Sequence, residues 1–431
     1  MRGRNISEWN RLDNAAKIFP SNSTKDDTKV FRFACELKED IDPVFLQTAL
    51  DATMGDFPIY SSTLKHGLFW YYLEESAMRP YVREENAPPC SPIYHKDKKS
   101  LLFRVTYYRK RINLEVYHAL SDGTGALQFL RTLVYRYLLL KYPGRWENTP
   151  VLDYDATDTQ KNDDSFQKYY KSGGRKRRTI KKRKRFACRL RMQRVPEGRM
   201  RIIEGVMPLS AVLEKAREME TTVTALLSGI LLVAIAGELP ARAKKRPVVL
   251  DIPVNLRKYF DSASARNFFS VVNVGYDFSR GSGELMPVVR KVREDLRSEL
   301  AEENIRSRLD ALAGLEHNLL TRVMPLFVKD VGLRIAYDVN QAEATAALSN
   351  IGKITMPEEM ADCVRLFDVI VSTNRLQICM CSYRDNMTIS FSSAFLGTDI
   401  QKRFFRILTE MGIEIEITAN RLDGWDRGEK P

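Results

Sequence analysis

The sequence predicts a two-layer α/β protein made of two mixed domains. A chain of 431 residues is long for one domain and ample for two. Strand-type and helix-type hydrophobic patterns alternate in each half, and a polar stretch with neither pattern separates the halves. We therefore place a first domain at residues 1–150, a polar and basic crossover at 151–199, and a second domain at 200–431.

The first half contains four predicted strands and two predicted helices. Alternating or continuous apolar runs rich in Val, Phe and Tyr predict strands at 29–37, 67–75, 100–110 and 111–120. Apolar residues with helical spacing predict helices at 42–54 and 124–142. The second helix should end at Pro143-Gly144, since these two residues do not continue a helix.

The second half repeats this mixed style. A helix pair is expected over 209–238, and helices fill much of 284–330. A last helix is predicted at 399–416, where the sequence reads DIQKRFFRILTEMGIEIE. The strand patterns lie at 246–257, 267–278, 347–356, 366–374, 375–383 and 386–395.

One uncharged segment, 221–237, is a candidate for membrane insertion. It has seventeen residues, which is short for a span, and it includes several Thr, Ser and Gly. The amphipathic segment LSAVLEKAREME precedes it directly. We therefore expect a helix buried in the core of the second domain and no membrane span.

Positive charge is concentrated in one short run. Of the net charge of +13, nine positive charges lie in 175–185, RKRRTIKKRKR, which contains no acid. Such a run can bind nucleic acid, CoA phosphates or an acidic carrier protein, or it can be a solvated loop. No aromatic residue interleaves with the cations, so the sequence favours the solvated loop and makes nucleic acid an unlikely partner.

Cysteine usage indicates a reducing compartment. The N-terminal residues MRGRNISEWNRLDN have no apolar core typical of a signal peptide, so we expect a cytoplasmic protein with reduced thiols. Cys379 and Cys381 lie two residues apart, but no second Cys/His pair completes a metal site, and the whole chain has four histidines. We therefore expect no metal site. The six cysteines are scattered over Cys35, Cys90, Cys188, Cys363, Cys379 and Cys381.

His118 is the residue with the clearest chemical potential. It lies at the C-terminal end of the predicted strand RINLEVYHAL, where ligands commonly bind in α/β sheets. Ser121-Asp122-Gly123 forms a turn, and a helical pattern begins at once. A histidine held by rigid backbone on both sides suits a general base, and its ordinary pKa of about 6.5 leaves it neutral at pH 7. The alternative is a histidine that only makes structural hydrogen bonds.

His118, Asp122 and Gly123 form the motif HxxxDG, which resembles the CoA-dependent acyltransferase superfamily. Its members include chloramphenicol acetyltransferase-like enzymes and peptide-synthetase condensation domains. Further stretches resemble the bacterial alcohol acetyltransferase-like branch, so the resemblance extends over nearly the whole chain. These stretches are RLDNAAKIFPS, FPIYSSTLKHGLFWYYLE, TTVTALLSGILLVAI, DIPVNLRKYF, ALSNIGKI and SFSSAFLGTDIQKRFF.

The resemblance implies a fold and a reaction. The fold would be two chloramphenicol acetyltransferase-like domains with a channel at their interface and His118 in the middle of the channel. His118 would take a proton from a small alcohol or amine, which attacks an acyl-CoA or carrier-protein thioester. Acyl-CoA would be a co-substrate, and no cofactor would be permanently bound. Two-domain members of this superfamily are generally monomers, so a monomer is expected.

The resemblance also assigns supporting residues. Asp122 would point away from the substrate and pair with an arginine, for which Arg257 is the candidate, and Gly123 would permit the turn. The second histidine of the condensation-domain motif HHxxxDG is kept here, but the first is Tyr117, which argues against a condensation role. Candidates for the channel wall and for oxyanion binding are Asn350, Ser392 and Ser393, although the sequence favours a structural hydrogen-bonding role for each of them.

Two other functions are compatible with the sequence. A binding or scaffold protein could use the same fold with His118 no longer catalytic. A nucleic-acid-associated protein could act through the basic run 175–185, and its binding would then be salt-sensitive and abolished by deletion of that run. The intact His-Asp-Gly set favours the acyltransferase.

Overall fold

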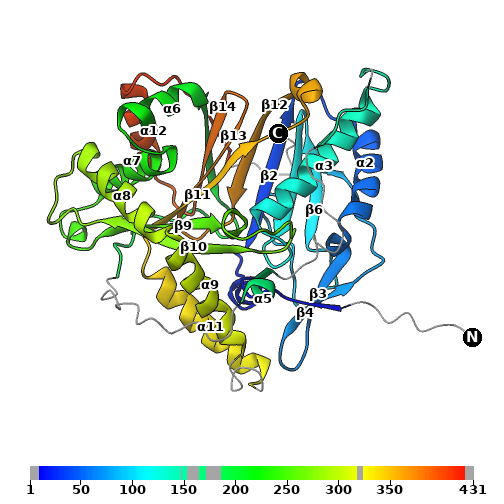
Figure 1. Ribbon diagram of the computed structural model, residues 1–431, viewed down its shortest axis with the longest axis horizontal. Coiled ribbons are helices and arrows are strands. Elements are labelled where there is room, and N and C mark those ends of the chain that lie inside the picture. The colour runs from blue at the N-terminus through cyan, green and yellow to red at the C-terminus, as the bar shows by residue number, and fades with distance from the viewer. Residues whose placement is uncertain (1–8, 147, 153–164, 171–185, 318–323, 423–431) are drawn as a thin grey trace, which may run out of the picture.

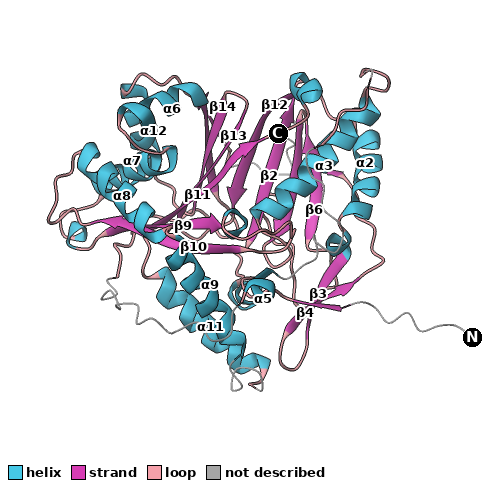
Figure 2. Ribbon diagram, in the orientation of Figure 1, coloured by secondary structure: helices cyan, strands magenta, loops and turns pink. Residues whose placement is uncertain are grey.

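The computed structural model describes residues 9–146, 148–152, 165–170, 186–317 and 324–422. Helices and strands mix in both halves of the chain, which lie side by side (Figure 1). Figure 2 shows that helices cover the outer faces of the two large sheets. The predicted α/β class is therefore confirmed.

A five-stranded sheet carries the first half of the molecule. Its strand order is β12-β2-β7-β6-β5, and all neighbours are antiparallel except β5 and β6. The helices α2 (Pro43–Asp56) and α3 (Gly123–Lys141) pack against each other, and α3 packs on β2 and β7. The strands are β2 (Val30–Leu37), β5 (Arg83–Glu84), β6 (Phe103–Tyr108), β7 (Arg111–Tyr117) and β12 (Val364–Val371).

A seven-stranded sheet carries the second half, in the order β10-β9-β11-β13-β14-β8-β15. Its strands are β8 (Arg201–Pro208), β9 (Val248–Asn255), β10 (Phe269–Tyr276), β11 (Ala346–Ile354), β13 (Leu376–Tyr383), β14 (Asn386–Ser393) and β15 (Glu416–Ala419). The helices beside it are α6 (Leu209–Glu218), α7 (Val223–Glu238), α8 (Leu285–Glu299) and α12 (Asp399–Glu410).

The other elements lie around these two sheets. A small sheet has the order β1-β4-β3, with β1 (Trp9–Arg11), β3 (Ser62–His66) and β4 (Tyr71–Glu75). The remaining helices are α1 (Phe19–Asn22), α5 (Ser165–Tyr169), α9 (Glu302–His317) and α11 (Leu326–Gln341). The short 3-10 helices are η1 (Ala16–Ile18), η2 (Pro58–Ser61), η3 (Ala243–Lys245), η4 (Leu256–Lys258) and η5 (Glu358–Cys363).

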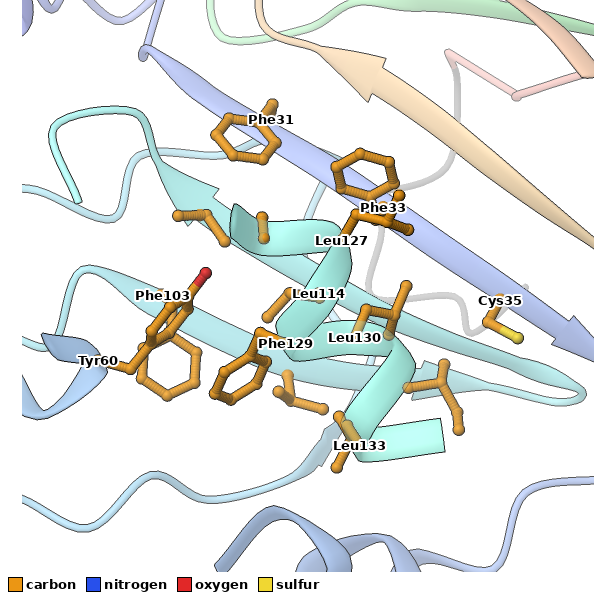
Figure 3. Packing of buried hydrophobic residues seen from close by; sticks show 14 of the residues in the cluster. Phe31, Phe33, Cys35, Tyr60, Phe103, Leu114, Leu127, Phe129, Leu130 and Leu133 are labelled. Atoms are coloured by element: carbon orange, nitrogen blue, oxygen red, sulfur yellow. The ribbon is translucent and has the colours of Figure 1, made fainter. Parts of the chain in front are cut away.

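Each large sheet has its own hydrophobic core. In the first half, the apolar face of α3 packs against the sheet, because its large apolar side chains recur at helical spacing (Figure 3). Phe129 stacks on Tyr60 with ring centroids 4.2 Å apart and contacts Phe103 edge-on. In the second half, α7 is buried along most of its length, as the sequence predicts.

The main departure from a sequential division of the chain is β12. It follows β11 in the second half, yet it pairs antiparallel with β2 and completes the first sheet. It also packs against β13 and β14, so it joins the two halves. The domain limits at residues 150 and 199 stay a prediction, and the basic run 175–185 lies outside the described residues.

Some local predictions were incomplete. The strands β3 and β8 were missed, because STLKH has a single apolar residue and RIIEGVMP has its apolar residues in adjacent pairs and not in alternation. The predicted last helix is too long: α12 ends at Glu410, and Glu416–Ala419 forms the edge strand β15. Gly412, with a φ of +85°, provides the left-handed turn after the helix.

Candidate active site

A cavity of about 600 Å³ lies between residues of the two halves. From the first half, Phe31, Phe33 and the segment around His118 form its wall. From the second half, β9, β11, β12 and β13 contribute side chains together with α8. The polar and charged residues on the wall are His118, Asp122, Thr124, Thr222, Thr224, Asn255, Lys258, Tyr259, Arg293, Arg297, Ser349, Asn350 and Gln377.

His118 is held from several sides at the end of β7. Its backbone N–H donates to the carbonyl of Lys29 at 2.8 Å. The ring stacks on Phe19 with centroids 4.4 Å apart and contacts Phe31 edge-on at 4.9 Å. Phe269 adds a third aromatic contact from the second half. The ring thus borders the cavity in an orientation fixed by packing.

The surroundings of His118 keep its imidazole neutral. Burial among aromatic rings lowers its pKa below the ordinary 6.5, because the cation loses hydration. The negative charge of Asp122, a hydrogen bond of the ring with the backbone of His118 itself and a hydrogen bond with Asn267 oppose this shift. The positive charge of Lys29 reinforces it. The net pKa is lowered, so at pH 7 the ring is unprotonated on one nitrogen and can accept a proton.

Asp122 is fully occupied by donors from the protein. Its Oδ1 accepts the backbone N–H groups of Thr124 and Gly125 at 3.1 and 3.0 Å, which caps α3. Its Oδ2 accepts Nη1 of Arg257 at 2.7 Å and the backbone N–H of Phe268 at 2.8 Å. The structure thus brings together the predicted pair Asp122 and Arg257, with side chains 6% and 9% exposed.

Arg257 connects Asp122 to a loop of the second half. Its Nε and Nη2 donate to the carbonyl of Ser264 at 3.0 and 2.8 Å, and Nη2 also donates to the carbonyl of Arg266. The guanidinium therefore ties the start of α3 to the loop between η4 and β10. The pair supports the backbone around His118, and its charges are compensated locally.

Two glycines start α3, and they are packed differently. A Cβ on Gly123 would lie 3.2 Å from Cδ1 of Ile351, at the cavity wall. A Cβ on Gly125 would lie 2.0 Å from the carbonyl oxygen of Ala265. Ser121 Oγ donates to the same carbonyl at 2.5 Å. Gly123 was singled out from the sequence, whereas the tighter contact is at Gly125.

The three predicted polar candidates fall in two different places. Asn350 lines the cavity, donates from Nδ2 to Thr224 Oγ1 at 2.9 Å, and accepts the backbone N–H of Gly352 at 2.8 Å. Ser392 and Ser393 are buried in β14 and do not border the cavity. Their hydroxyl groups accept the backbone N–H groups of Val371 and Phe395 at 3.4 and 3.1 Å.

Sequence reasoning missed several residues of the site. Asn267 contacts the His118 ring, with its Oδ1 3.1 Å from Nδ1. Lys258, Arg293 and Arg297 give the cavity wall three cations, and none of them forms an ion pair with a described acid. No local signal marks these residues, because they come from η4, α8 and a loop about 150 positions after His118.

Neither a metal site nor a membrane helix was found in the described ranges. No group of three His, Cys, Asp or Glu side chains that could hold a metal ion occurs among these residues. All six cysteines are free and buried. In the part of the chain that the structure describes, no single helix is long and apolar enough to cross a membrane. Taken together, α6 and α7 have the length and composition of a membrane span, but the two helices are bent by 84° relative to each other.

Comparison with known proteins supports the predicted resemblance. Residues 209–374 match the family described as phthiocerol/phthiodiolone dimycocerosyl transferase C-terminus. No curated protein matches the chain. Solved structures with similar folds cover nearly all of the chain at low sequence identity, so they inform on the fold.

Three of these structures illustrate the likeness. Polyketide synthase associated protein 5 from Mycobacterium tuberculosis is 14% identical, with a TM-score of 0.56 over 92% of this chain and 96% of that chain. The first condensation domain of the calcium-dependent antibiotic synthetase is 15% identical, with a TM-score of 0.65 over 96% and 100%. F. graminearum TRI101, complexed with coenzyme A and T-2 mycotoxin, is 11% identical, with a TM-score of 0.63 over 95% and 100%.

These findings confirm the resemblance to the CoA-dependent acyltransferase and condensation-domain superfamily. The two-domain fold that the resemblance implies is the fold observed. The family match lies in the second half, whereas the HxxxDG motif lies in the first.

Proposed function

We propose that this protein, which has the fold of the CoA-dependent acyltransferase and condensation-domain superfamily, is an acyltransferase. It would move an acyl group from a CoA or carrier-protein thioester to a hydroxyl or amine acceptor. The observation that carries the proposal is His118, a neutral imidazole on the wall of a cavity shared by both halves. Asp122 beside it is saturated with donors and leaves the proton transfer to His118.

The reaction needs one base and no change of oxidation state. His118 accepts the proton of the acceptor, whose oxygen or nitrogen attacks the thioester carbonyl. A tetrahedral oxyanion forms, the carbon–sulfur bond breaks, and the departing sulfur takes the proton from the imidazolium. Of the three predicted oxyanion candidates we retain Asn350, since it borders the cavity.

The cations on the cavity wall support an anionic donor. Lys258 and Arg297 are exposed at the cavity, and Arg293 is half-buried, where it donates to the carbonyl of Glu220. Phosphate groups of CoA or of a carrier-protein arm are dianionic or monoanionic and suit such a wall. We therefore place the phosphate end of the donor at α8 and its thioester at His118.

The decisive experiment measures thiol release from a panel of acyl-CoA thioesters with water or a simple alcohol as acceptor. We expect release above background by the parent protein and loss of at least about 100-fold in His118→Ala, the range typical of a general base. His95→Ala, an exposed histidine on a loop, is the matched control and should retain activity. Equal release by parent and His118→Ala would reject His118 as the base.

A second experiment tests the position of the donor. Arg297→Glu should raise KM for acyl-CoA about 10-fold with little change for an acyl-pantetheine, which lacks the nucleotide phosphates. Arg290→Glu, an exposed arginine in α8 outside the cavity wall, is the control. If KM rises equally for both thioesters, the phosphates do not bind at Arg297.

A further inference from the structure

Asn267 forms a set of hydrogen bonds that joins His118 to the N-terminal segment. Its Oδ1 lies 3.1 Å from Nδ1 of His118, and its Nδ2 donates to the carbonyl oxygen of His118 at 3.0 Å. Nδ2 also lies 3.3 Å from Oδ2 of Asp13, which accepts the backbone N–H of Asn267 at the same distance. Asn267 and Asp13 are each 1% exposed.

The partners of Asn267 determine which way its amide points. The carbonyl oxygen of His118 and the carboxylate of Asp13 only accept hydrogen bonds, so the amide NH₂ must face them. A flipped amide would place Oδ1 against these two oxygens and lose both hydrogen bonds that Nδ2 donates. The correct orientation therefore puts Oδ1 toward Nδ1 of His118.

This orientation in turn fixes the proton on the ring. Oδ1 of an amide can only accept, so Nδ1 of His118 must carry the hydrogen. A neutral imidazole has one hydrogen, which leaves Nε2 with a free electron pair. Among the described residues Nε2 has no hydrogen-bond partner, and the ring borders the cavity.

We propose that Asn267 is a positioning residue that holds His118 as the Nδ1–H tautomer, with Nε2 as the base, and that Asp13 orients the Asn267 amide. Asp13 is itself fixed, because its Oδ1 accepts the backbone N–H of Ala16 at 2.8 Å and Arg266 lies 3.9 Å from its Oδ2. Three distant segments of the chain thus meet at Asn267.

A neutral amide has a specific consequence for the chemistry. During transfer the proton of the acceptor goes to Nε2, while the Nδ1 hydrogen stays on the bond to Oδ1, so the ring carries both hydrogens until the leaving sulfur takes one. An asparagine stabilises this cation less than a carboxylate would. Burial outweighs the effect of this hydrogen bond, so the pKa of His118 stays below its ordinary value. The catalytic meaning of the tautomer rests on the proposed function, whereas the tautomer itself does not.

The tautomer can be measured without any activity. In protein labelled with ¹⁵N-histidine, two-bond ¹H–¹⁵N spectra distinguish a protonated ring nitrogen from an unprotonated one. The chain has four histidines, and His118→Gln identifies the signal of interest. We expect protonated Nδ1 and unprotonated Nε2 in the parent, and a mixture of tautomers in Asn267→Ala. Protonated Nε2 in the parent, or an unchanged spectrum in Asn267→Ala, would overturn the proposal.

Kinetics provide the second test. Asn267→Ala should lower kcat about 10- to 100-fold and leave KM within about twofold, because it affects the base and not donor binding. Asn267→Asp should move the acid limb of the kcat–pH profile to higher pH, since a carboxylate at Nδ1 stabilises the imidazolium. Asn273→Ala, an exposed asparagine of β10, is the matched control. If Asn267→Asp folds and its acid limb does not shift, the proposed positioning of His118 by residue 267 is wrong.

Asp13 is tested through Asn267. If Asp13 acts only by orienting the amide, the double variant Asp13→Ala/Asn267→Ala should have the kcat of Asn267→Ala alone. Multiplicative losses would assign Asp13 a separate role and reject this step. Because the parent spectrum reports the tautomer directly, a protein with protonated Nδ1 but no thioester activity would refute the proposed function and leave the positioning role intact.

Discussion

At the scale of the residue, the site depends on hydrogen bonds and ion pairs that satisfy its buried polar groups. Asp122 receives four hydrogen bonds and Arg257 donates to three acceptors besides Asp122, so each charge is matched inside the protein. His118 is the exception, since its Nε2 has no partner among the described residues. A ring nitrogen without a hydrogen-bond partner can accept a proton from a substrate, and the neighbouring charges of Asp122 and Arg257 are already paired with each other.

Removal of Asp122 should therefore damage stability and activity together. Asp122→Ala leaves Arg257 buried without its carboxylate and uncaps α3, and we expect a loss of about 3–5 kcal/mol in the free energy of unfolding. Urea denaturation followed by circular dichroism measures this loss. Asp338→Ala, an exposed aspartate of α11, should change stability by less than about 0.5 kcal/mol. If Asp122→Ala unfolds like the parent and only turnover falls, Asp122 acts in the chemistry instead.

At the scale of the element, the start of α3 positions the site. His118 follows directly after the strand β7, and Asp122 is the N-cap residue of α3. The first turn of α3 packs on the loop that contains Asn267. The helix approaches this loop closely because Gly125 has no side chain. The distance between α3 and the loop thus determines whether Asn267 reaches the ring.

The variant Gly125→Ala should separate these elements. Its methyl group would overlap the backbone of Ala265, so the loop or the helix must move, and we expect about 1–3 kcal/mol of destabilisation with lower kcat. Gly55→Ala in α2 has nothing within 4 Å of its Cβ, and alanine in a helix should stabilise by up to about 1 kcal/mol. Thermal melting of both variants tests this contrast, and equal melting temperatures would show that the contact is loose.

At the scale of the whole molecule, partly buried ionic contacts join the two sheets. Arg111 of β7 donates to both carboxylate oxygens of Glu204 in β8 at 2.9 and 2.8 Å, and to Glu36 of β2 at 2.7 Å. In the same region Ser390 of β14 donates to Asp368 of β12. Burial, together with the nearby charge of Glu204, raises the pKa of Asp368 to about 7, while Arg111 opposes the shift.

Asp368 should make the free energy of unfolding depend on pH. Between the ordinary pKa of 3.8 and about 7, the folded protein holds a proton on Asp368 that the unfolded chain releases. Stability contributed by this group is therefore present at low pH and falls as pH rises through this window, by at most about 1.4 kcal/mol per unit.

Asp368→Asn imitates the protonated acid and should remove this contribution. Urea midpoints at pH 5 and pH 7.5 test the prediction: the difference between parent and Asp368→Asn should change over this interval, with the variant relatively more stable at pH 7.5. Asp385→Asn, on the exposed turn before β14, serves as control. A constant difference would mean that Asp368 does not hold a proton in the folded state.

The sequence alone determined those features that local patterns encode. Period-two runs predicted most strands, and helical spacing predicted α2, α3 and the buried α7. HxxxDG and further stretches resemble the superfamily, and that resemblance implied the pairing of Asp122 with an arginine, for which Arg257 was the candidate. What it could not determine depends on segments distant in the chain. The pairing of β12 with β2, the contacts of Asn267 with His118 and with Asp13, and the cations on the cavity wall arise only when both sheets are assembled. Hydrophobic periodicity specifies which face of an element is buried, whereas the partner of that face is chosen by packing of the whole molecule.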